Sequence, residues 1–186
     1  MGQKVTTAAR ATIEDLYRVP EHGKAEIVDG ELVLMSPTGA RPGRAGGAIY
    51  ASLRRHEKTA GGGFAFPDNV GFIVDLPNRM SFSPDVAFHA GSEPTMKFVE
   101  GAPVFAVEVR SESDYGSAAE ERMARKRADY FAAGTLVVWD VDLVGPDVVR
   151  VHRKGEPQPR IYRRGEVAEA EPAVPGWTMA VDELFD

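Results

Sequence analysis

The sequence predicts an α/β fold with a central mixed β-sheet, flanked by helices and with antiparallel hairpins at its edges. The first observation is a strand, helix and strand in succession: apolar runs at 104–109 and 135–139 enclose a helical segment at 117–133. A crossover of this kind implies that its two strands are parallel. The second is a pair of strand-like runs joined by Asp29-Gly30, the dipeptide best suited to a type I′ turn. Together they predict parallel and antiparallel pairing in one fold.

The N-terminal part contains a short helix followed by this hairpin. Thr12 fits the N-cap position, and Asp15 stands three residues later as in a capping box, with the helix ending near Pro20. The runs 25–28 and 31–35 are apolar and rich in β-branched or long aliphatic residues. They predict the two strands of the hairpin.

A second helix follows the loop rich in glycine, proline and arginine at 36–43. Small and apolar residues then recur at spacings of three and four, which predicts an amphipathic helix ending before Gly61-Gly62-Gly63. Short runs at 64–66, 70–74 and 85–88 predict further strands between proline, glycine and asparagine residues.

The second half adds a third helix and several edge strands. Met123, Arg127, Tyr130 and Phe131 share one face of the helix predicted at 117–133, and Gly134 supplies its C-terminal stop. The tail predicts antiparallel edge strands and a final helical turn, at 148–152, 160–162 and 181–185.

Length and composition bound the class of protein. With 186 residues and 43% hydrophobic content, the chain is expected to form a single domain spanning residues 1–186. No window approaches the roughly 20 apolar residues of a membrane span, and the N-terminus lacks a signal-peptide core. We therefore expect a cytoplasmic protein.

Charge and metal-ligand content restrict the kind of site. The formal net charge of -6 argues against binding nucleic acid through a broad basic surface, although a local basic groove stays compatible with it. The chain has no cysteine, which excludes disulfides and thiolate metal sites. Its histidines, His22, His56, His89 and His152, lack the close spacing of a zinc motif. Any metal site must therefore be rich in oxygen ligands.

Two acidic residues stand in apolar surroundings on consecutive predicted strands. Asp85 follows Pro84 at the start of one run, and Glu108 lies within the next, which reads Val-Phe-Ala-Val-Glu-Val-Arg from Val104. Burying an unpaired carboxylate costs several kcal/mol, so a cation between the two is expected. Carboxylate oxygens suit magnesium or manganese. The pair predicts a divalent-metal site of the kind that hydrolyses phosphodiesters.

Strand periodicity places small neighbours beside both acids. Residues two apart in a strand face the same way, so Asp85 shares a face with Ala87, and Glu108 with Ala106 and Arg110. The opposite face carries the core residues, Val86, Phe88, Phe105, Val107 and Val109. His89 also lies on the face of Asp85 and is a weaker candidate for a functional residue.

The chain resembles the Uma-two family of restriction-endonuclease-like proteins, a branch of the PD-(D/E)xK nuclease superfamily, over nearly all of its length. The resemblance rests on an ordered set of segments: 26–32, 35–37, 83–86, 102–109, Lys126 with Tyr130, 133–134, 138–139 and 174–177. It implies a restriction-endonuclease-like fold and a magnesium-dependent nuclease site. Asp85 and Glu108 match the family's metal-binding acids, and Glu26 matches its upstream acid, a third metal ligand.

Two positions depart from the wider pattern. The lysine that commonly follows the second acid by two residues is Arg110 here, and arginine stays protonated, so it can stabilise phosphate charge but cannot accept a proton from water. The family commonly retains a lysine on the following helix, and Lys126 stands at that position. Many members also carry a histidine in the loop where this chain has Arg41-Pro42-Gly43. We predict catalytic roles for Asp85, Glu108, Lys126 and Arg110.

Each of these residues also has a purely structural interpretation. Asp85 could cap nearby backbone amides, and Glu108 could pair with Arg110 or Lys126. Lys126 lies in a charged helical run, which is usually solvated, and a glutamate such as Glu26 at the start of a hairpin is more often on the surface.

The basic residues suggest where nucleic acid would bind. Arg41, Arg44, Arg122 and Arg125 could follow a phosphate backbone. The sequence therefore predicts a magnesium-dependent or manganese-dependent endonuclease acting on DNA, single- or double-stranded. The alternative is a weak or inactive nucleic-acid-binding or assembly module that retains the fold. The chain shows no heptad seam, and a homodimer stays an open arrangement.

Overall fold

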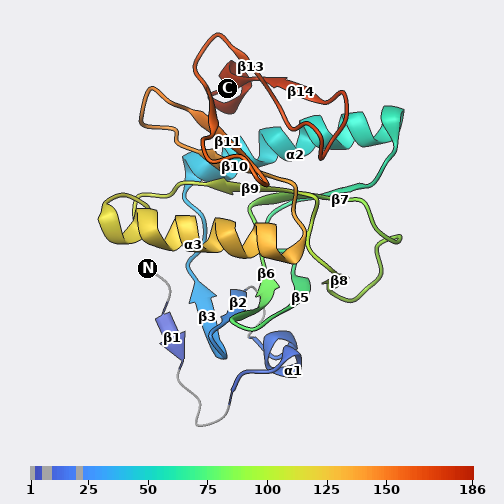
Figure 1. Ribbon diagram of the computed structural model, residues 1–186, viewed down its shortest axis with the longest axis vertical. Coiled ribbons are helices and arrows are strands. Elements are labelled where there is room, and N and C mark those ends of the chain that lie inside the picture. The colour runs from blue at the N-terminus through green and yellow to red at the C-terminus, as the bar shows by residue number, and fades with distance from the viewer. Residues whose placement is uncertain (1–2, 6–9, 20–22) are drawn as a thin grey trace.

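The strands form two six-stranded sheets and a small ribbon in a computed structural model that describes residues 3–5, 10–19 and 23–186 (Figure 1). The first sheet has, in spatial order, β1 (Gln3–Val5), β3 (Glu31–Met35), β2 (Lys24–Val28), β6 (Arg79–Phe82), β5 (Phe72–Leu76) and β8 (Val99–Glu100). The second has β12 (Arg160–Tyr162), β11 (Val149–Arg153), β10 (Val137–Val141), β9 (Phe105–Val109), β7 (Val86–His89) and β4 (Phe64–Phe66). The ribbon pairs β13 (Val167–Glu169) with β14 (Thr178–Ala180).

The helices are α1 (Ile13–Tyr17), α2 (Ala40–Ala60), α3 (Ser117–Ala133) and a final 3₁₀ turn at Val181–Leu184. The helices α2 and α3 lie on opposite sides of the second sheet, whereas α1 packs against the first sheet. In Figure 1, α2 and the C-terminal ribbon lie above this sheet, whereas α3 and the first sheet lie below it. Mixed sheets flanked by helices confirm the predicted α/β class.

The strands divide between two sheets, whereas the sequence predicted one central sheet with hairpins at its edges. The hairpin of β2 and β3 pairs with β6 through Val28 and Arg79 and so extends into its own sheet. The strand pattern missed β6, because Arg79-Met-Ser-Phe is short and polar at two of its four positions. This division leaves the first sheet packed beside the acidic face of the second.

Local signals for the N-terminal elements are confirmed. Thr12 and Asp15 form the predicted capping box, and α1 ends at Tyr17, while Pro20 lies outside the described residues. Asp29 and Gly30 have φ values of 53° and 77°, as a type I′ turn requires.

The predicted crossover is also present. The strands β9 and β10 are parallel, with Glu108 opposite Asp140, and α3 connects them. The helix spans the predicted residues and ends at Gly134, whose φ of 114° lies in the left-handed region. Among the described residues, no helix combines the length and the apolar character needed to cross a membrane.

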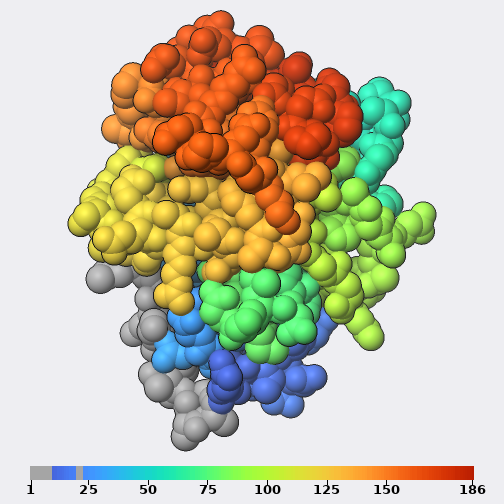
Figure 2. Space-filling model, viewed as in Figure 1, coloured from blue at the N-terminus to red at the C-terminus, as the bar shows by residue number. Residues whose placement is uncertain are grey.

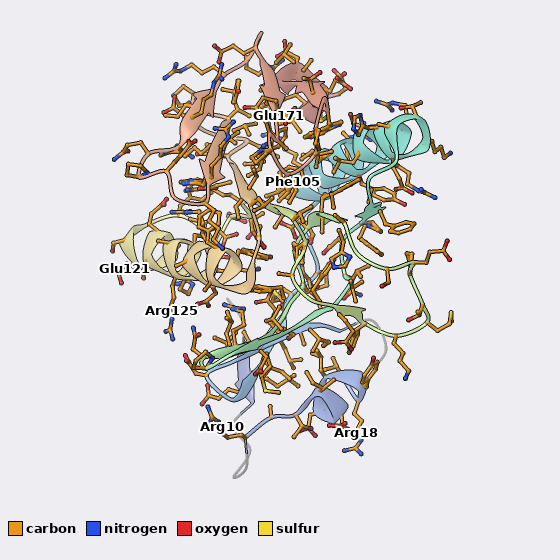
Figure 3. The ribbon with its side chains drawn as sticks, turned by 45° about the vertical axis from the view of Figure 1, so that its right-hand side comes forward. Arg10, Arg18, Phe105, Glu121, Arg125 and Glu171 are labelled. Atoms are coloured by element: carbon orange, nitrogen blue, oxygen red, sulfur yellow. The ribbon has the colours of Figure 1, made fainter. Side chains whose placement is uncertain are left out.

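The two faces of the second sheet carry different cores, as strand periodicity predicted. One face packs against α2 and the C-terminal segment, and it includes Val86, Phe88, Phe105, Val107 and Val109. Phe105 lies in the interior on this side (Figure 3) and contacts both Trp139 and Trp177. The other face carries Ala87 and Ala106, which pack with Tyr130 of α3 and Phe82 of the first sheet. The acidic residues belong to this second face.

Candidate active site

Asp85 and Glu108 lie side by side on neighbouring strands. Asp85 directly precedes β7, its backbone N–H donates to the carbonyl of Val107 at 3.0 Å, and Val86 is the register partner of Val107 in β9. The backbone N–H of Val109 also donates to Asp85 Oδ2 at 2.7 Å. One oxygen of Asp85 thus caps a backbone amide, as the structural interpretation of this residue predicted. Its second oxygen, Oδ1, contacts the ammonium group of Lys24.

Glu108 is held from α3. Tyr130 donates its hydroxyl to Glu108 Oε1 at 2.7 Å, and Lys126 Nζ lies 2.8 Å from the same oxygen. Burial raises the pKa of Glu108 above its ordinary value despite the opposing charge of Lys126, and the like charges of Asp85 and Glu26 add to the rise. Glu108 therefore carries its negative charge at a cost that a cation would relieve.

Lys126 connects two carboxylates from different sheets. Its Nζ lies 2.9 Å from Glu26 Oε1 as well as 2.8 Å from Glu108, and 17% of its side chain is exposed. Burial by itself would lower the pKa of Lys126, but the charges of Glu108 and Glu26 outweigh burial and raise it. Lys126 is therefore a cation at neutral pH. The predicted approach of this helical lysine to Glu108 is present in the structure.

Glu26 is enclosed by donors on both of its oxygens. Arg79 Nη1 donates to Oε2 at 2.6 Å, while the backbone N–H of Ser83 at 2.9 Å and Lys126 both contact Oε1. Burial opposes ionisation, yet Lys126 and Arg79 hold the pKa of Glu26 at about 2. The sequence predicted Glu26 as a metal ligand. The structure brings it to the site but engages both oxygens, which suits an anchor for Lys126.

A second lysine, which sequence reasoning missed, contacts Asp85. Lys24 Nζ lies 2.8 Å from Asp85 Oδ1 and 2.7 Å from Asp68 Oδ1. Lys24 and Glu26 are two residues apart in β2 and therefore share a face of the strand. This spacing is the signal that could have identified Lys24. Burial would lower the pKa of Lys24, but Asp85 and Glu108 outweigh burial and raise it.

Two further residues complete the network and were also missed. Arg79, which holds Glu26, donates its Nε to Asp129 Oδ2 of α3 at 2.8 Å. Both side chains are buried, so the pair connects the first sheet to the helix that carries Lys126. Removing one partner of such a buried pair leaves an uncompensated charge.

Arg110 is engaged away from the acidic pair. Its Nε and Nη2 each donate to a carboxylate oxygen of Asp140 at 2.7 Å, and Glu120 of α3 accepts from Nη1 and, at 3.1 Å, from Nη2. Arg110 is 7% exposed. The sequence expected this side chain beside Glu108 and a phosphate; its contacts instead support the junction of β9, β10 and α3.

The arginines predicted to bind nucleic acid are exposed on α2 and α3. Arg122 lies one turn before Lys126 on α3 and so extends the same helical face outwards. Arg125 pairs with Asp29 of the hairpin at 2.9 Å and lies below α3, on the side of the first sheet, in Figure 3. Arg41 and Arg44 lie in the first turns of α2, and Arg44 donates to the backbone oxygen of Asp186 at 2.7 Å. The space-filling view shows α3 exposed between the C-terminal layer and the first sheet (Figure 2).

The charges of this network leave room for one divalent cation. Among the described residues, this network sets Lys24, Lys126 and Arg79 against the five carboxylates of residues 26, 68, 85, 108 and 129, an excess of two formal negative charges. Magnesium commonly binds one or two carboxylates and keeps several waters. Asp85 and Glu108 fit that requirement. Within the described residues, no group of three or more histidine, cysteine, aspartate or glutamate side chains is arranged so that it could hold a metal ion.

His152 is half-buried outside this network, and its surroundings give a pH-dependent prediction. Burial and the charge of Arg127 lower its pKa from 6.5 to about 4, and its Nε2 has no hydrogen-bond partner among the residues that the structure describes. Because the folded state binds the proton less well than the unfolded state, stability is complete above pH 6.5 and falls as the pH drops towards 4. We expect the free energy of unfolding to fall by on the order of 2 kcal/mol over this range.

Urea unfolding of the wild type and His152→Asn at pH 7 and pH 4.5 checks this prediction. The variant should lose part of the pH dependence, whereas the matched control His56→Asn, on the last turns of α2, should keep it. Equal pH dependence in the wild type and His152→Asn would contradict the assignment.

The comparisons with known proteins agree with this architecture. A family model described as "Uma2: Putative restriction endonuclease" matches residues 12–182. The chain is also similar to a solved structure from Anabaena variabilis ATCC 29413, described as a "putative nuclease belonging to DUF820". That likeness has a TM-score of 0.74 at 14% identity and covers 94% of this chain and 97% of the other, so it concerns the fold. No curated protein sequence matches the chain. Since the family model covers nearly the whole chain, this protein belongs to the Uma2 family of restriction-endonuclease-like proteins.

Proposed function

We propose that the protein is a metal-dependent endonuclease that hydrolyses DNA phosphodiester bonds. The observation that carries the proposal is the pair of neighbouring carboxylates, Asp85 and Glu108, with Lys126 in contact with Glu108. Membership of a family described as restriction endonucleases supports a nucleic-acid substrate.

Asp85 and Glu108 would hold the cation, Mg²⁺ or Mn²⁺, through oxygens that suit a hard ion. A cation bound there polarises a phosphate and lowers the pKa of a bound water. Asp85 and Glu108 place two carboxylates next to each other where β7 begins and β9 ends, which favours the binding of a cation there. The pKa of Glu108 is raised mainly by its burial, and the like charges of Asp85 and Glu26 add to the rise.

Lys126 would orient the attacking water and stabilise charge on the phosphate. Its raised pKa keeps it protonated at neutral pH, so we assign it an electrostatic role and not that of a base. Glu26 positions Lys126 by contacting it, and Tyr130 positions Glu108 by donating a hydrogen bond to it. Arg110 supports the helix through Glu120 and acts as a positioning residue.

Arg41, Arg44, Arg122 and Arg125 would contact the DNA backbone. Arg122 is the best placed of these, because it is exposed on the face of α3 that carries Lys126. Phosphate contacts of this kind position the duplex and carry no sequence information.

A second candidate function is a weak or inactive nucleic-acid-binding or assembly module. One observation favours it: the position that commonly holds the catalytic lysine is Arg110, and this side chain is engaged by Asp140 and Glu120. The two functions share a binding surface and differ in whether a phosphodiester bond is broken.

Incubation of the purified protein with single-stranded and double-stranded DNA separates the two. The endonuclease proposal expects cleavage in Mg²⁺ or Mn²⁺ that EDTA abolishes and that returns when the metal is restored. Binding in a gel-shift assay without cleavage in either metal would favour the module. Cleavage that persists in EDTA would contradict metal dependence.

A further inference from the structure

Lys24 occupies a distinctive position at the acidic pair. It lies between Asp85 and Asp68, at 2.8 and 2.7 Å, and 12% of its side chain is exposed. The other oxygen of Asp85, Oδ2, accepts a hydrogen bond from the backbone N–H of Val109. Lys24 is therefore bound to the one oxygen of Asp85 that a metal ion would need.

The two acceptors of Lys24 differ in their surroundings. The side chain of Asp85 is 16% exposed and next to Glu108, whereas that of Asp68 is 42% exposed and accepts a hydrogen bond from Thr38 at 3.2 Å. Asp68 can keep the ammonium group after Asp85 has changed partners, because it already contacts Lys24 directly. Release of Asp85 therefore leaves the lysine paired and does not create an unpaired buried charge.

Lys126 has no comparable second position. Its partners among the described residues, Glu26 and Glu108, have side chains that are 6% and 26% exposed, against 42% for Asp68. Both oxygens of Glu26 also accept hydrogen bonds from Arg79 or Ser83. The asymmetry between the two lysines gives them different roles: Lys126 is fixed in place, and Lys24 has an acceptor inside the site and another at its edge.

We propose that Lys24 is the resident counterion of Asp85 and sets the affinity for the divalent cation by competing for Asp85 Oδ1. Asp68 retains Lys24 when the cation binds. The proposal rests on the proposed function only in its assignment of Asp85 as a metal ligand. It makes Lys24 and Asp68 positioning residues that act through Asp85.

Binding of Mn²⁺ to the full-length protein without nucleic acid tests the proposal by titration calorimetry. Lys24→Met should bind Mn²⁺ about tenfold or more tightly, because a competing unit charge next to the ion is removed. Asp68→Asn should bind it several-fold more weakly, because Asp85 is then the one acidic partner left to Lys24 among the described residues. Lys58→Met, which removes the same charge from the exposed C-terminal turn of α2, should leave the affinity unchanged.

The double variant Lys24→Met/Asp68→Asn distinguishes Asp68 from a metal ligand. If Asp68 acts through Lys24, the double variant should bind Mn²⁺ like Lys24→Met alone. Equal weakening by Asp68→Asn with and without Lys24 would overturn the role given to Asp68. Mn²⁺ affinity that is unchanged or lower in Lys24→Met would overturn the competition. Lys24→Gln replaces Lys24→Met if the latter does not fold.

These results are independent of catalysis. Protein that binds Mn²⁺ with the predicted order of affinities but cuts no DNA would contradict the proposed function and leave the role of Lys24 supported. Binding that is insensitive to Asp85→Asn would overturn both.

Discussion

Asp85→Asn and Glu108→Gln should each lower the rate of DNA cleavage by about a thousandfold or more, since each removes a charged ligand from the cation that activates water and phosphate. Single-turnover cleavage of labelled DNA in saturating Mg²⁺ measures the effect. Asp75→Asn and Glu121→Gln serve as matched controls, because both acids are exposed and lie outside the acidic network.

The stability of these variants separates a functional from a structural acid. Burial and the nearby carboxylates raise the pKa of Glu108, so its charged form is disfavoured in the folded protein. The neutral amide of Glu108→Gln keeps an acceptor for Tyr130 and removes that cost. We therefore expect the urea midpoint of Glu108→Gln to be no lower than that of the wild type. A large loss of stability with little loss of cleavage would identify Glu108 as a structural partner of Lys126.

Lys126→Met should lower cleavage by about a hundredfold or more, because it removes the cation nearest to Glu108. It should also destabilise the fold by about 3–5 kcal/mol, since Glu26 and Glu108 would then be buried with fewer opposing charges. Cleavage rates and urea unfolding of the same preparations give both quantities.

Two further variants separate the electrostatic role of Lys126 from its structural role. Lys126→Met combined with Glu26→Gln removes a cation and an anion together, so it should recover stability without recovering cleavage. Arg122→Met removes a charge one turn away on the same helix and should weaken DNA binding while leaving the fold unchanged. Full cleavage by a folded Lys126→Met variant would show that Lys126 does not replace the lysine of the wider pattern.

The elements that were predictable from the sequence depend on local physics. Thr12 with Asp15, the Asp29-Gly30 turn and the Gly134 stop are all signals between residues close in the chain. The alternation in β7 and β9 likewise placed Ala87 and Ala106 on one face with the two acids. These features required no knowledge of which strands would meet.

The division into two sheets and the partners of the basic residues were not predictable in this way. Pairing of Val28 with Arg79 joins residues that are far apart in the chain, and nothing local specifies it. The same holds for Lys24, whose contact with Asp85 spans 61 positions. Arg110 follows Glu108 by two residues, but α3 brings Glu120 to it and β10 brings Asp140, so tertiary packing decides its partners.

Asp85 and Glu108 are proposed to bind the catalytic cation together. A crystal structure of the protein soaked in Mn²⁺, with anomalous diffraction data, tests this assignment most directly. We expect an anomalous peak in contact with the carboxylates of both residues, with Lys24 retained by Asp68. A peak elsewhere would contradict this assignment. So would a Mn²⁺-soaked crystal without a peak at the two carboxylates, in which Asp85 still contacts Lys24 and Glu108 still contacts Lys126.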